Sequence, residues 1–392
     1  MNIKRRNGVC LLLGAVMLQG LSFNVSAANN EKIKVGVMLP FSGVYAHLGK
    51  TTRDGMLLAI EQHADMLNGR EIEFVESDTK AQPALAPELA SEMLNRHKAD
   101  FVVGPVHSGV LLGMLRVLRN QDTVMIIPNA GAQVATGQLC APNVFRTSFS
   151  TWQTTYPMGQ VAIDRGYKNI YTISWNYTGG KEAIAGFEES FKAAGGTISK
   201  QILVPFPSTN FQPIISDVAS AKPDAVFVFF AGGGAIEFVN TYSAMGLSDT
   251  IPLLGAGFLT EGTLEQQGDA AEGILTTLHY SNSLENAENE AFRAAFQKKY
   301  DYEPDLYSVQ GYDTGLLIVE AVASVGGDVS DKKKMLKAMS ELRIQSPRGD
   351  FTFSKANNPV QDIYLREVVE GKNLVKGIAS KSLEDPARGC DL

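Results

Sequence analysis

The stretch Lys98-Ala99-Asp100-Phe101-Val102-Val103-Gly104 is matched further along the chain by Lys222-Pro223-Asp224-Ala225-Val226-Phe227-Val228. Each stretch runs through an apolar segment into a turn of small residues, 105–109 in the first and 231–234 in the second. Chance similarity is one explanation, and two similar α/β lobes are the other. Because open parallel sheets bind ligands beyond the carboxyl ends of their strands, we expect a binding site at these turns.

Short apolar runs alternate with amphipathic stretches around these two units, which is typical of parallel sheets covered by helices. We expect strands at residues 33–39, 72–76, 101–104, 124–127, 170–174, 198–204, 225–230 and 252–254. We expect helices at residues 51–66, 84–96, 110–119, 155–165, 181–193, 211–220, 235–244, 288–299, 307–324 and 332–340. The predicted class is α/β, and 392 residues exceed the usual size of a single core, so two domains are expected.

Residues 1–28 have the features of a signal peptide for export. Lys4, Arg5 and Arg6 precede an apolar run at 9–18 and the small residues 26–28. The run is about half the roughly 20 residues of a membrane-spanning helix, which favours cleavage over a retained anchor. Removing three basic residues and no acid changes the net charge from −7 to −10, and such a surface repels nucleic acid. We therefore expect a periplasmic protein that does not bind nucleic acid.

Cys140 and Cys390 are the cysteines that remain after this processing. An exported protein folds in an oxidising compartment, where such a pair tends to form a disulfide. We predict a Cys140–Cys390 bond that pins the C-terminal tail, and the alternative is two unrelated buried thiols.

The sequence lacks the catalytic signatures that would indicate an enzyme, namely H-E-x-x-H, a P-loop, a nucleophile elbow and C-x-x-C. Gly232-Gly233-Gly234 and Gly255-Ala256-Gly257 do not have the spacing of a dinucleotide fingerprint. We expect no catalytic residues, no cofactor and no metal, and we interpret these glycines as places where backbone approaches a ligand closely.

The stretch Val35-Gly36-Val37-Met38-Leu39-Pro40-Phe41-Ser42-Gly43 resembles the type I periplasmic binding proteins of the branched-chain amino-acid importer family. Further matches follow in the family's order, at residues 103–105, 127–130, 145–147, 186–187, 311–313 and 348–351. The resemblance implies two doubly wound parallel-sheet lobes, joined by a three-stranded hinge, with the ligand in the cleft. It assigns residues 32–148 and 277–342 to the N-terminal lobe, and residues 149–276 and 343–392 to the C-terminal lobe.

The resemblance also implies where the ligand is held. In amino-acid-binding members, hydroxyl residues after the third and fourth strands hold the carboxylate, and an acid in the second lobe pairs with the ammonium. Ser108 fits the first position, but the second falls on Gly131 and the acid falls on Gly257. A buried ammonium without a countercharge costs several kcal/mol. We therefore expect a ligand that has no α-amino group.

Aromatic residues crowd the loops that the resemblance places around the cleft, and they are Tyr45, Trp152, Trp175, Tyr177, Phe230, Phe258 and Tyr280. Ring contacts add about 0.5 to 1.5 kcal/mol each beyond burial. Several of these rings could instead pack the lobes, and we expect about half of them to contact the ligand. The set resembles the branch of the family that binds aromatic acids.

Polar candidates complete the predicted site. Ser108 and His107 would hold a carboxylate at the start of helix 110–119, although Ser108 could equally serve as an ordinary N-cap. Backbone and amide groups would come from Asn129, Ala130 and Gly131. A ring hydroxyl would be bound by Gln310 with Tyr280, and Ser42 joins the set through its place in the first matching stretch.

We thus expect the substrate-binding component of an ABC importer, which captures a small organic acid, an aromatic carboxylate of the benzoate or phenylpropanoid type. Its partners would be an inner-membrane permease and its ATPase subunits, and the protein would be a monomer. The alternatives are a protein that binds branched-chain or other amino acids and a sensory module that passes its closed form to a receptor.

Overall fold

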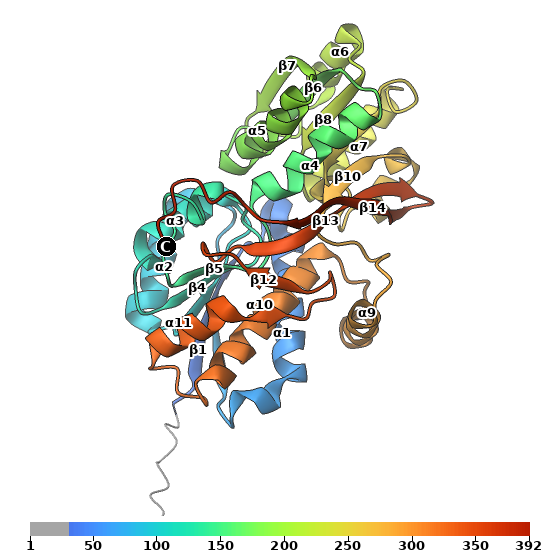
Figure 1. Cartoon of the computed structure of the whole chain (residues 1–392). Coiled ribbons are helices and arrows are strands. Elements are labelled where there is room, and N and C mark those ends of the chain that lie inside the picture. The colour runs from blue at the N-terminus through green and yellow to red at the C-terminus, as the bar shows by residue number, and fades with distance from the viewer. Residues whose placement is uncertain (1–30) are drawn as a thin grey trace, which may run out of the picture. The chain divides into compact units, whose positions relative to one another are not determined.

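The computed structural model describes residues 31–392, so the predicted signal peptide lies outside the described residues. Within that range the chain forms α-helices and two sheets whose strands are mostly parallel (Figure 1). None of the helices in residues 31–392 combines the length and the apolar character that a membrane crossing requires.

The first sheet has the strand order β2-β1-β3-β4-β5, and all its pairs are parallel. Its strands are β1 Ile33–Leu39, β2 Ile72–Asp78, β3 Phe101–Val103, β4 Val124–Ile127 and β5 Val144–Arg146. The first four strands are those that the apolar runs predict. Helices α1 Ala46–Gln62, α2 Ala86–Ser91 and α3 Ser108–Leu118 connect these strands, and a π-helical turn, Glu92–His97, continues α2.

The second sheet repeats this order as β7-β6-β8-β9-β10 before it adds antiparallel strands. Its parallel strands are β6 Asn169–Trp175, β7 Thr197–Val204, β8 Ala225–Phe229, β9 Leu253–Ala256 and β10 Leu275–Leu278. Its helices are α4 Thr151–Asp164, α5 Thr178–Ala193, α6 Gln212–Ala221, α7 Gly233–Ala244 and α8 Leu264–Gln267. Two doubly wound α/β lobes with the same strand order confirm the predicted fold class.

The matched stretches around Lys98 and Lys222 play the same structural part in both lobes. Each lysine ends a helical segment in the left-handed conformation, with φ of 55° at Lys98 and 49° at Lys222. The aspartate two residues later accepts a backbone N–H at the start of the neighbouring strand: Asp100 Oδ2 lies 3.0 Å from Lys34 N, and Asp224 Oδ2 lies 2.8 Å from Asn169 N. The motif therefore ends a helix and sets the start of two adjacent strands.

The last third of the chain returns to the first lobe and then crosses again. Helices α9 Ala287–Tyr300, α10 Leu306–Ser324 and α11 Lys332–Glu341 follow β10, and α10 packs along α1 (Figure 1). Strands β11 Arg343–Ile344, β12 Phe351–Phe353, β13 Pro359–Val369 and β14 Lys372–Leu383 extend the second sheet, where β13 runs antiparallel to β10. The chain therefore passes between the lobes after β5, after β10 and at the start of β13.

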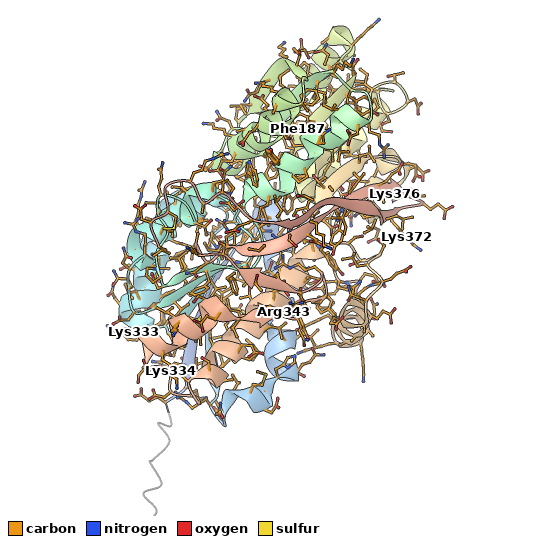
Figure 2. All side chains as sticks on the ribbon, in the orientation of Figure 1. Phe187, Lys333, Lys334, Arg343, Lys372 and Lys376 are labelled. Carbon is orange, nitrogen blue, oxygen red and sulfur yellow. A yellow bond between two sulfur atoms is a disulfide. The ribbon has the colours of Figure 1, made fainter. Side chains whose placement is uncertain are left out.

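The outer surfaces of these last elements are polar. Helix α11 buries Met335 and Met339, four residues apart, and directs Lys333 and Lys334 outward (Figure 2). Lys372 and Lys376 project from β14, whereas Phe187 of α5 is buried against Phe227 of β8 (Figure 2). The apolar spacing on each element thus marks the face that packs on its sheet.

The predicted disulfide is present, because Cys140 and Cys390 are bonded across 250 residues of sequence. Cys140 lies between β4 and β5 of the first lobe, and Cys390 ends the tail that leaves β14. The bond therefore ties the tail to the first lobe. The lobe boundaries remain a prediction, and this bond joins residues assigned to different lobes.

Candidate ligand-binding site

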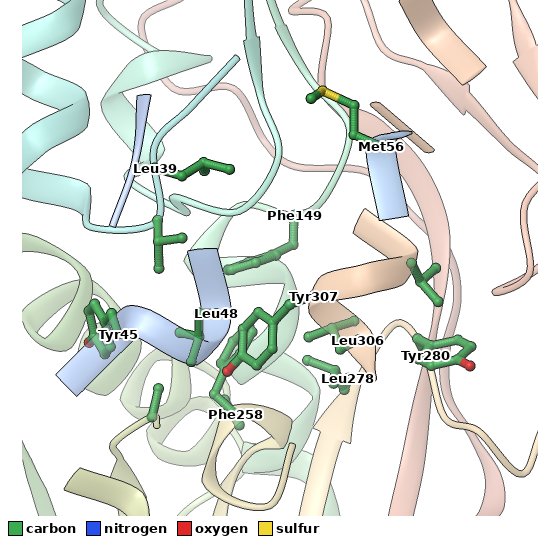
Figure 3. Close-up of a cluster of buried hydrophobic side chains, with 14 of the residues drawn as sticks. Leu39, Tyr45, Leu48, Met56, Phe149, Phe258, Leu278, Tyr280, Leu306 and Tyr307 are labelled. Atoms are coloured by element: carbon green, nitrogen blue, oxygen red, sulfur yellow. The ribbon is translucent and has the colours of Figure 1, made fainter. Parts of the chain in front are cut away.

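A cavity lies where the carboxyl ends of the strands of both sheets face each other, as open α/β sheets predict. Five of its lining residues, Tyr45, Leu48, Phe149, Phe258 and Tyr307, are labelled in Figure 3. The complete lining is Tyr45, Leu48, Val106, Ser108, Asn129, Gly131, Phe149, Thr151, Tyr177, Phe229, Ala231, Phe258 and Tyr307. Among these described residues none is Asp, Glu, Lys or Arg, and the polar side chains of the lining are hydroxyl groups and the amide of Asn129.

Ser108 lies at the edge of this cavity in the first turn of α3. Gly179 at the start of α5 approaches so closely that a Cβ atom there would lie 3.0 Å from Ser108 Oγ. The N-cap of α3 is His107 rather than Ser108, because His107 Nδ1 accepts hydrogen bonds from the backbone of Gly109 (3.1 Å) and Val110 (3.4 Å). The Ser108 hydroxyl is therefore not needed to cap its own helix.

His107 has a fixed protonation pattern as a result of this capping. Nδ1 accepts hydrogen bonds, so in the neutral ring Nε2 carries the proton, and no protein group bonds this buried nitrogen. Burial lowers the pKa of His107 to about 4. The ring stacks on Tyr177 of the other lobe, with centroids 4.7 Å apart. His107 thus offers a neutral N–H donor at neutral pH.

The amide of Asn129 is oriented by a buried chain of polar groups. Asn129 Nδ2 donates to Gln310 Oε1 at 2.7 Å, and Gln310 Nε2 lies 3.3 Å from His279 Nε2. Burial lowers the pKa of His279 well below its ordinary value, and the nearby Arg348 and Arg366 lower it further. Asn129 lines the cavity, whereas Gln310 does not and holds Asn129 from behind.

The two residues after Asn129 differ in their availability to a ligand. The backbone N–H of Ala130 donates to the carbonyl of Pro105 at 3.0 Å and is therefore engaged. The carbonyl of Gly131 accepts from the backbone N–H of Thr151 at 2.8 Å. Gly131 lines the cavity, and a Cβ atom there would lie 2.4 Å from Thr151 Oγ1. Glycine at this position thus lets the first lobe-to-lobe crossing pack against the loop after β4.

Aromatic rings from both lobes form the apolar wall of the cavity (Figure 3). Phe149, on the first crossing, packs on Phe258 of the second lobe with centroids 4.8 Å apart. Phe258 also lies 5.7 Å from Phe229 and 6.4 Å from Tyr307. These rings offer faces and edges to a planar ligand.

Gly257, the position where amino-acid-binding members carry an acid, has its space filled by a basic side chain. Arg366 Nη2 donates to the Gly257 carbonyl at 3.1 Å and would lie 2.5 Å from a Cβ atom at this position. Arg366 is fully buried and forms an ion pair with Glu261, whose other oxygen accepts from the backbone N–H of Leu306. The acid nearest in sequence is therefore already paired and does not line the cavity.

Several predicted contacts lie outside the cavity. Ser42 donates to Asp78 at 2.7 Å, and Trp152 donates to Glu189 at 3.2 Å. Trp175, Phe230 and Tyr280 are buried in packed surroundings. Trp175 donates to the Ser208 carbonyl, Phe230 packs on Phe211, and the Tyr280 hydroxyl lies 2.6 Å from Asn282 Oδ1. Of the fifteen predicted ligand-binding residues, the cavity therefore brings together Tyr45, Ser108, Asn129, Gly131, Tyr177 and Phe258.

Seven lining residues were not predicted from the sequence, and they are Leu48, Val106, Phe149, Thr151, Phe229, Ala231 and Tyr307. Successive residues of a strand point to opposite faces, so Phe229 rather than Phe230 reaches the cavity. Thr151 is the first residue of α4, and the capping box that Ser150 forms with Gln153 is a sequence pattern that could have predicted where this helix starts. The described residues contain no group of three His, Cys, Asp or Glu side chains that could hold a metal.

The free space inside the cavity is about 20 Å³, which is room for about one water molecule. Side chains from both lobes therefore fill most of the site. A ring-sized ligand can enter only if the lobes separate or these side chains move, which is the hinge behaviour that two-lobed binding proteins use.

A family model for periplasmic binding proteins matches residues 32–373. The chain therefore belongs to the periplasmic binding protein family, and it is a solute-binding protein of the ABC transporter type rather than an enzyme. Leu/Ile/Val-binding protein homolog 6 of Brucella melitensis is 31% identical over 356 residues, which cover 89% of this chain and 90% of the relative.

Two similar solved structures contain aromatic acids. A solute-binding protein from R. palustris in complex with benzoate is 43% identical and has a TM-score of 0.90. The match covers 92% of this chain and 100% of the R. palustris chain. A second solute-binding protein, from Rhodopseudomonas palustris BisB5 in complex with 3,4-dihydroxy benzoic acid, is 31% identical and has a TM-score of 0.86. The match covers 91% of this chain and 99% of the BisB5 chain.

Proposed function

We propose that this protein captures an aromatic carboxylate of the benzoate type in the periplasm and delivers it to the permease and ATPase subunits of an ABC importer. The observation that carries the proposal is a cavity lined by rings and hydroxyl groups, in which no described lining residue is charged. A benzoate has one anionic group and one flat apolar ring, and the two kinds of lining group match these two parts.

Support for the carboxylate comes from the first turn of α3. Ser108 offers its hydroxyl at the N-terminal end of an eleven-residue helix, where the helix dipole favours an anion. The neutral Nε2–H of His107 and the side chains of Asn129 and Thr151 are the further polar groups in or beside this part of the lining. None of these groups carries a charge, so the anion would be held by hydrogen bonds and the helix terminus.

Support for a ligand without an amino group comes from Gly257 and Arg366. The ammonium of an amino acid would need a carboxylate partner, and Glu261 is already paired with Arg366. Amino-acid binding remains the second candidate, because relatives such as the Brucella melitensis protein are named for leucine, isoleucine and valine. The uncharged lining favours the aromatic acid.

The proposal is tested by calorimetric titration of the mature protein with benzoate, using Ser108→Ala and Ser42→Ala as a matched pair. We expect Ser108→Ala to weaken binding by about 1 to 3 kcal/mol, since it removes a hydrogen bond to a charged group. Ser42 lies outside the cavity and bonds Asp78, so Ser42→Ala should bind like the wild type. Unchanged affinity in Ser108→Ala would remove the proposed anion site.

A further inference from the structure

Three tyrosine side chains line the cavity and come from separate parts of the chain. Tyr45 ends the short 3-10 turn before α1, Tyr177 is the N-cap of α5, and Tyr307 lies in the first turn of α10. The hydroxyl oxygens of Tyr45 and Tyr177 are 3.5 Å apart across the two lobes. Tyr177 lies beside Ser108, because a Cβ atom at Gly179 would be 3.0 Å from both Ser108 Oγ and Tyr177 Cε2, whereas the Tyr307 ring packs on Phe258 with centroids 6.4 Å apart.

The hydrogen-bonding capacity of these hydroxyls is largely unused. The contact between Tyr45 and Tyr177 is at the upper limit of a hydrogen bond. Tyr307 is fully buried, and no protein group bonds its hydroxyl. Leucine and phenylalanine side chains surround it, with Leu48 and Phe258 close by in Figure 3. A buried hydroxyl without a partner is costly, so a polar atom of the ligand would be favoured here.

The charges around Tyr307 indicate which polar atom fits. Burial raises the pKa of Tyr307 well above its ordinary value, and the carboxylates of Asp305 and Glu261 raise it further, whereas Arg366 lowers it. Asp305 caps α10 two residues before Tyr307, so the N-terminus of this helix already holds an anion. The ligand carboxylate is therefore better placed at the N-terminus of α3, and a neutral oxygen at the far side of the ring suits Tyr307.

We propose that Tyr307 recognises a hydroxyl group on the ring, so that the preferred ligand is a hydroxylated aromatic acid. This inference rests on the proposed function and deepens it. The phenol of the ligand would donate to or accept from Tyr307, while its carboxylate lies at Ser108. Tyr307 is then the residue that distinguishes hydroxybenzoates from benzoate.

Calorimetric titrations with benzoate, 3-hydroxybenzoate and 4-hydroxybenzoate test this inference in the wild type, Tyr307→Phe and Tyr242→Phe. We expect at least one hydroxybenzoate to bind the wild type tighter than benzoate by on the order of tenfold or more. Tyr307→Phe should remove this preference and leave benzoate affinity within about threefold of the wild type. Tyr242→Phe is the control, because that hydroxyl bonds the Ile251 carbonyl in the core of the second lobe.

Two results would overturn the inference while leaving the proposed function in place. One is equal affinity of the wild type for benzoate and both hydroxybenzoates. The other is an equal loss of affinity for all three ligands in Tyr307→Phe, because that would place the ligand carboxylate at Tyr307. Failure of every aromatic acid to bind the wild type would overturn the proposed function itself. Melting temperatures of both variants confirm that each is folded.

Discussion

His107 caps helix α3 and stacks on Tyr177 of the other lobe. Because it is buried, its imidazole stays neutral. Nδ1 is held as an acceptor by the backbone of α3, and the ring lies against Tyr177. A charged imidazolium would lose the capping contacts, because protonated Nδ1 cannot accept a hydrogen bond. The closed contact between the lobes at this point therefore requires the neutral form.

This arrangement predicts a stability that falls in acid. The pKa of His107 is lowered to about 4 in the folded state, against about 6.5 for an unfolded histidine. Between these values the unfolded state binds the proton and the folded state does not, so stability is lost as the pH falls from about 6.5 to 4, by about 3 kcal/mol from this residue.

The measurement is the free energy of unfolding against pH for the wild type and His107→Asn. Asparagine keeps an acceptor for the helix N-terminus and cannot titrate. The variant should lose less stability than the wild type over this pH range. Parallel curves would show that His107 does not titrate between the folded and unfolded states. His279 is present in both proteins, so its contribution cancels in the comparison.

Single residues also show what the sequence could and could not predict. Gly257 and Gly131 were recognised as departures from the family pattern, and Gly257 has a physical reason in Arg366, which fills its side-chain space. That arginine is 109 residues away in sequence, so no local pattern predicts the contact. The sequence pointed to Phe230, whereas Phe229 lines the cavity, because two neighbouring rings at a strand end give no sign of which face is buried against the core.

Among the elements, the parallel strands and their covering helices were predicted best. Strands β1 and β4 have the predicted bounds, because continuous apolar runs between turns mark strands buried on both faces. The antiparallel strands β13 and β14 were missed. β14 alternates little and has no buried residue, since it pairs only with β13 and covers no core of its own. Its position depends on the lobe-to-lobe crossing, which the local sequence does not encode.

Helix α10 carries a charged group that holds two of the crossings together. Asp313 of α10 and Arg348 form a fully buried ion pair at 2.8 Å. Arg348 also donates to the carbonyls of Thr147 and Ser148 on the first crossing and to Gln361 at the start of β13. The matches at 311–313 and 348–351 that pointed to the family are thus parts of one hydrogen-bonded hinge.

We predict that Arg348→Ala lowers the free energy of unfolding by about 3 to 5 kcal/mol, because it leaves the Asp313 carboxylate buried without its partner. Arg343→Ala is a matched control, since Arg343 pairs with Asp350 at 2.8 Å on the surface, with 69% of its side chain exposed (Figure 2). That exposed pair should contribute about 0 to 1 kcal/mol. Urea denaturation measures both, and an equal effect of the two substitutions would contradict the structural role given to Arg348.

For the whole molecule, the chain crosses between the lobes three times, and the Cys140–Cys390 bond ties the tail beyond β14 to the first lobe. Before it reaches Cys390, the tail contacts the second lobe, where Arg388 pairs with Glu189 of α5 at 2.7 Å. Cysteine pairing could be predicted from the sequence because removal of the predicted signal peptide would leave two cysteines, whereas the path of the tail across both lobes could not.

We propose that the two lobes close together on an aromatic carboxylate and not on an amino acid. A thermal-shift comparison tests this proposal, because a ligand that binds only the folded state raises the melting temperature. The melting temperature of the mature protein is measured with benzoate, hydroxybenzoates, hydroxycinnamates, aliphatic acids, leucine and valine. At a ligand concentration of about 100 times Kd, the gain is about 2.7 kcal/mol. We predict a rise with aromatic acids and none with leucine or valine. A rise with leucine or valine and none with any aromatic acid would contradict the claim.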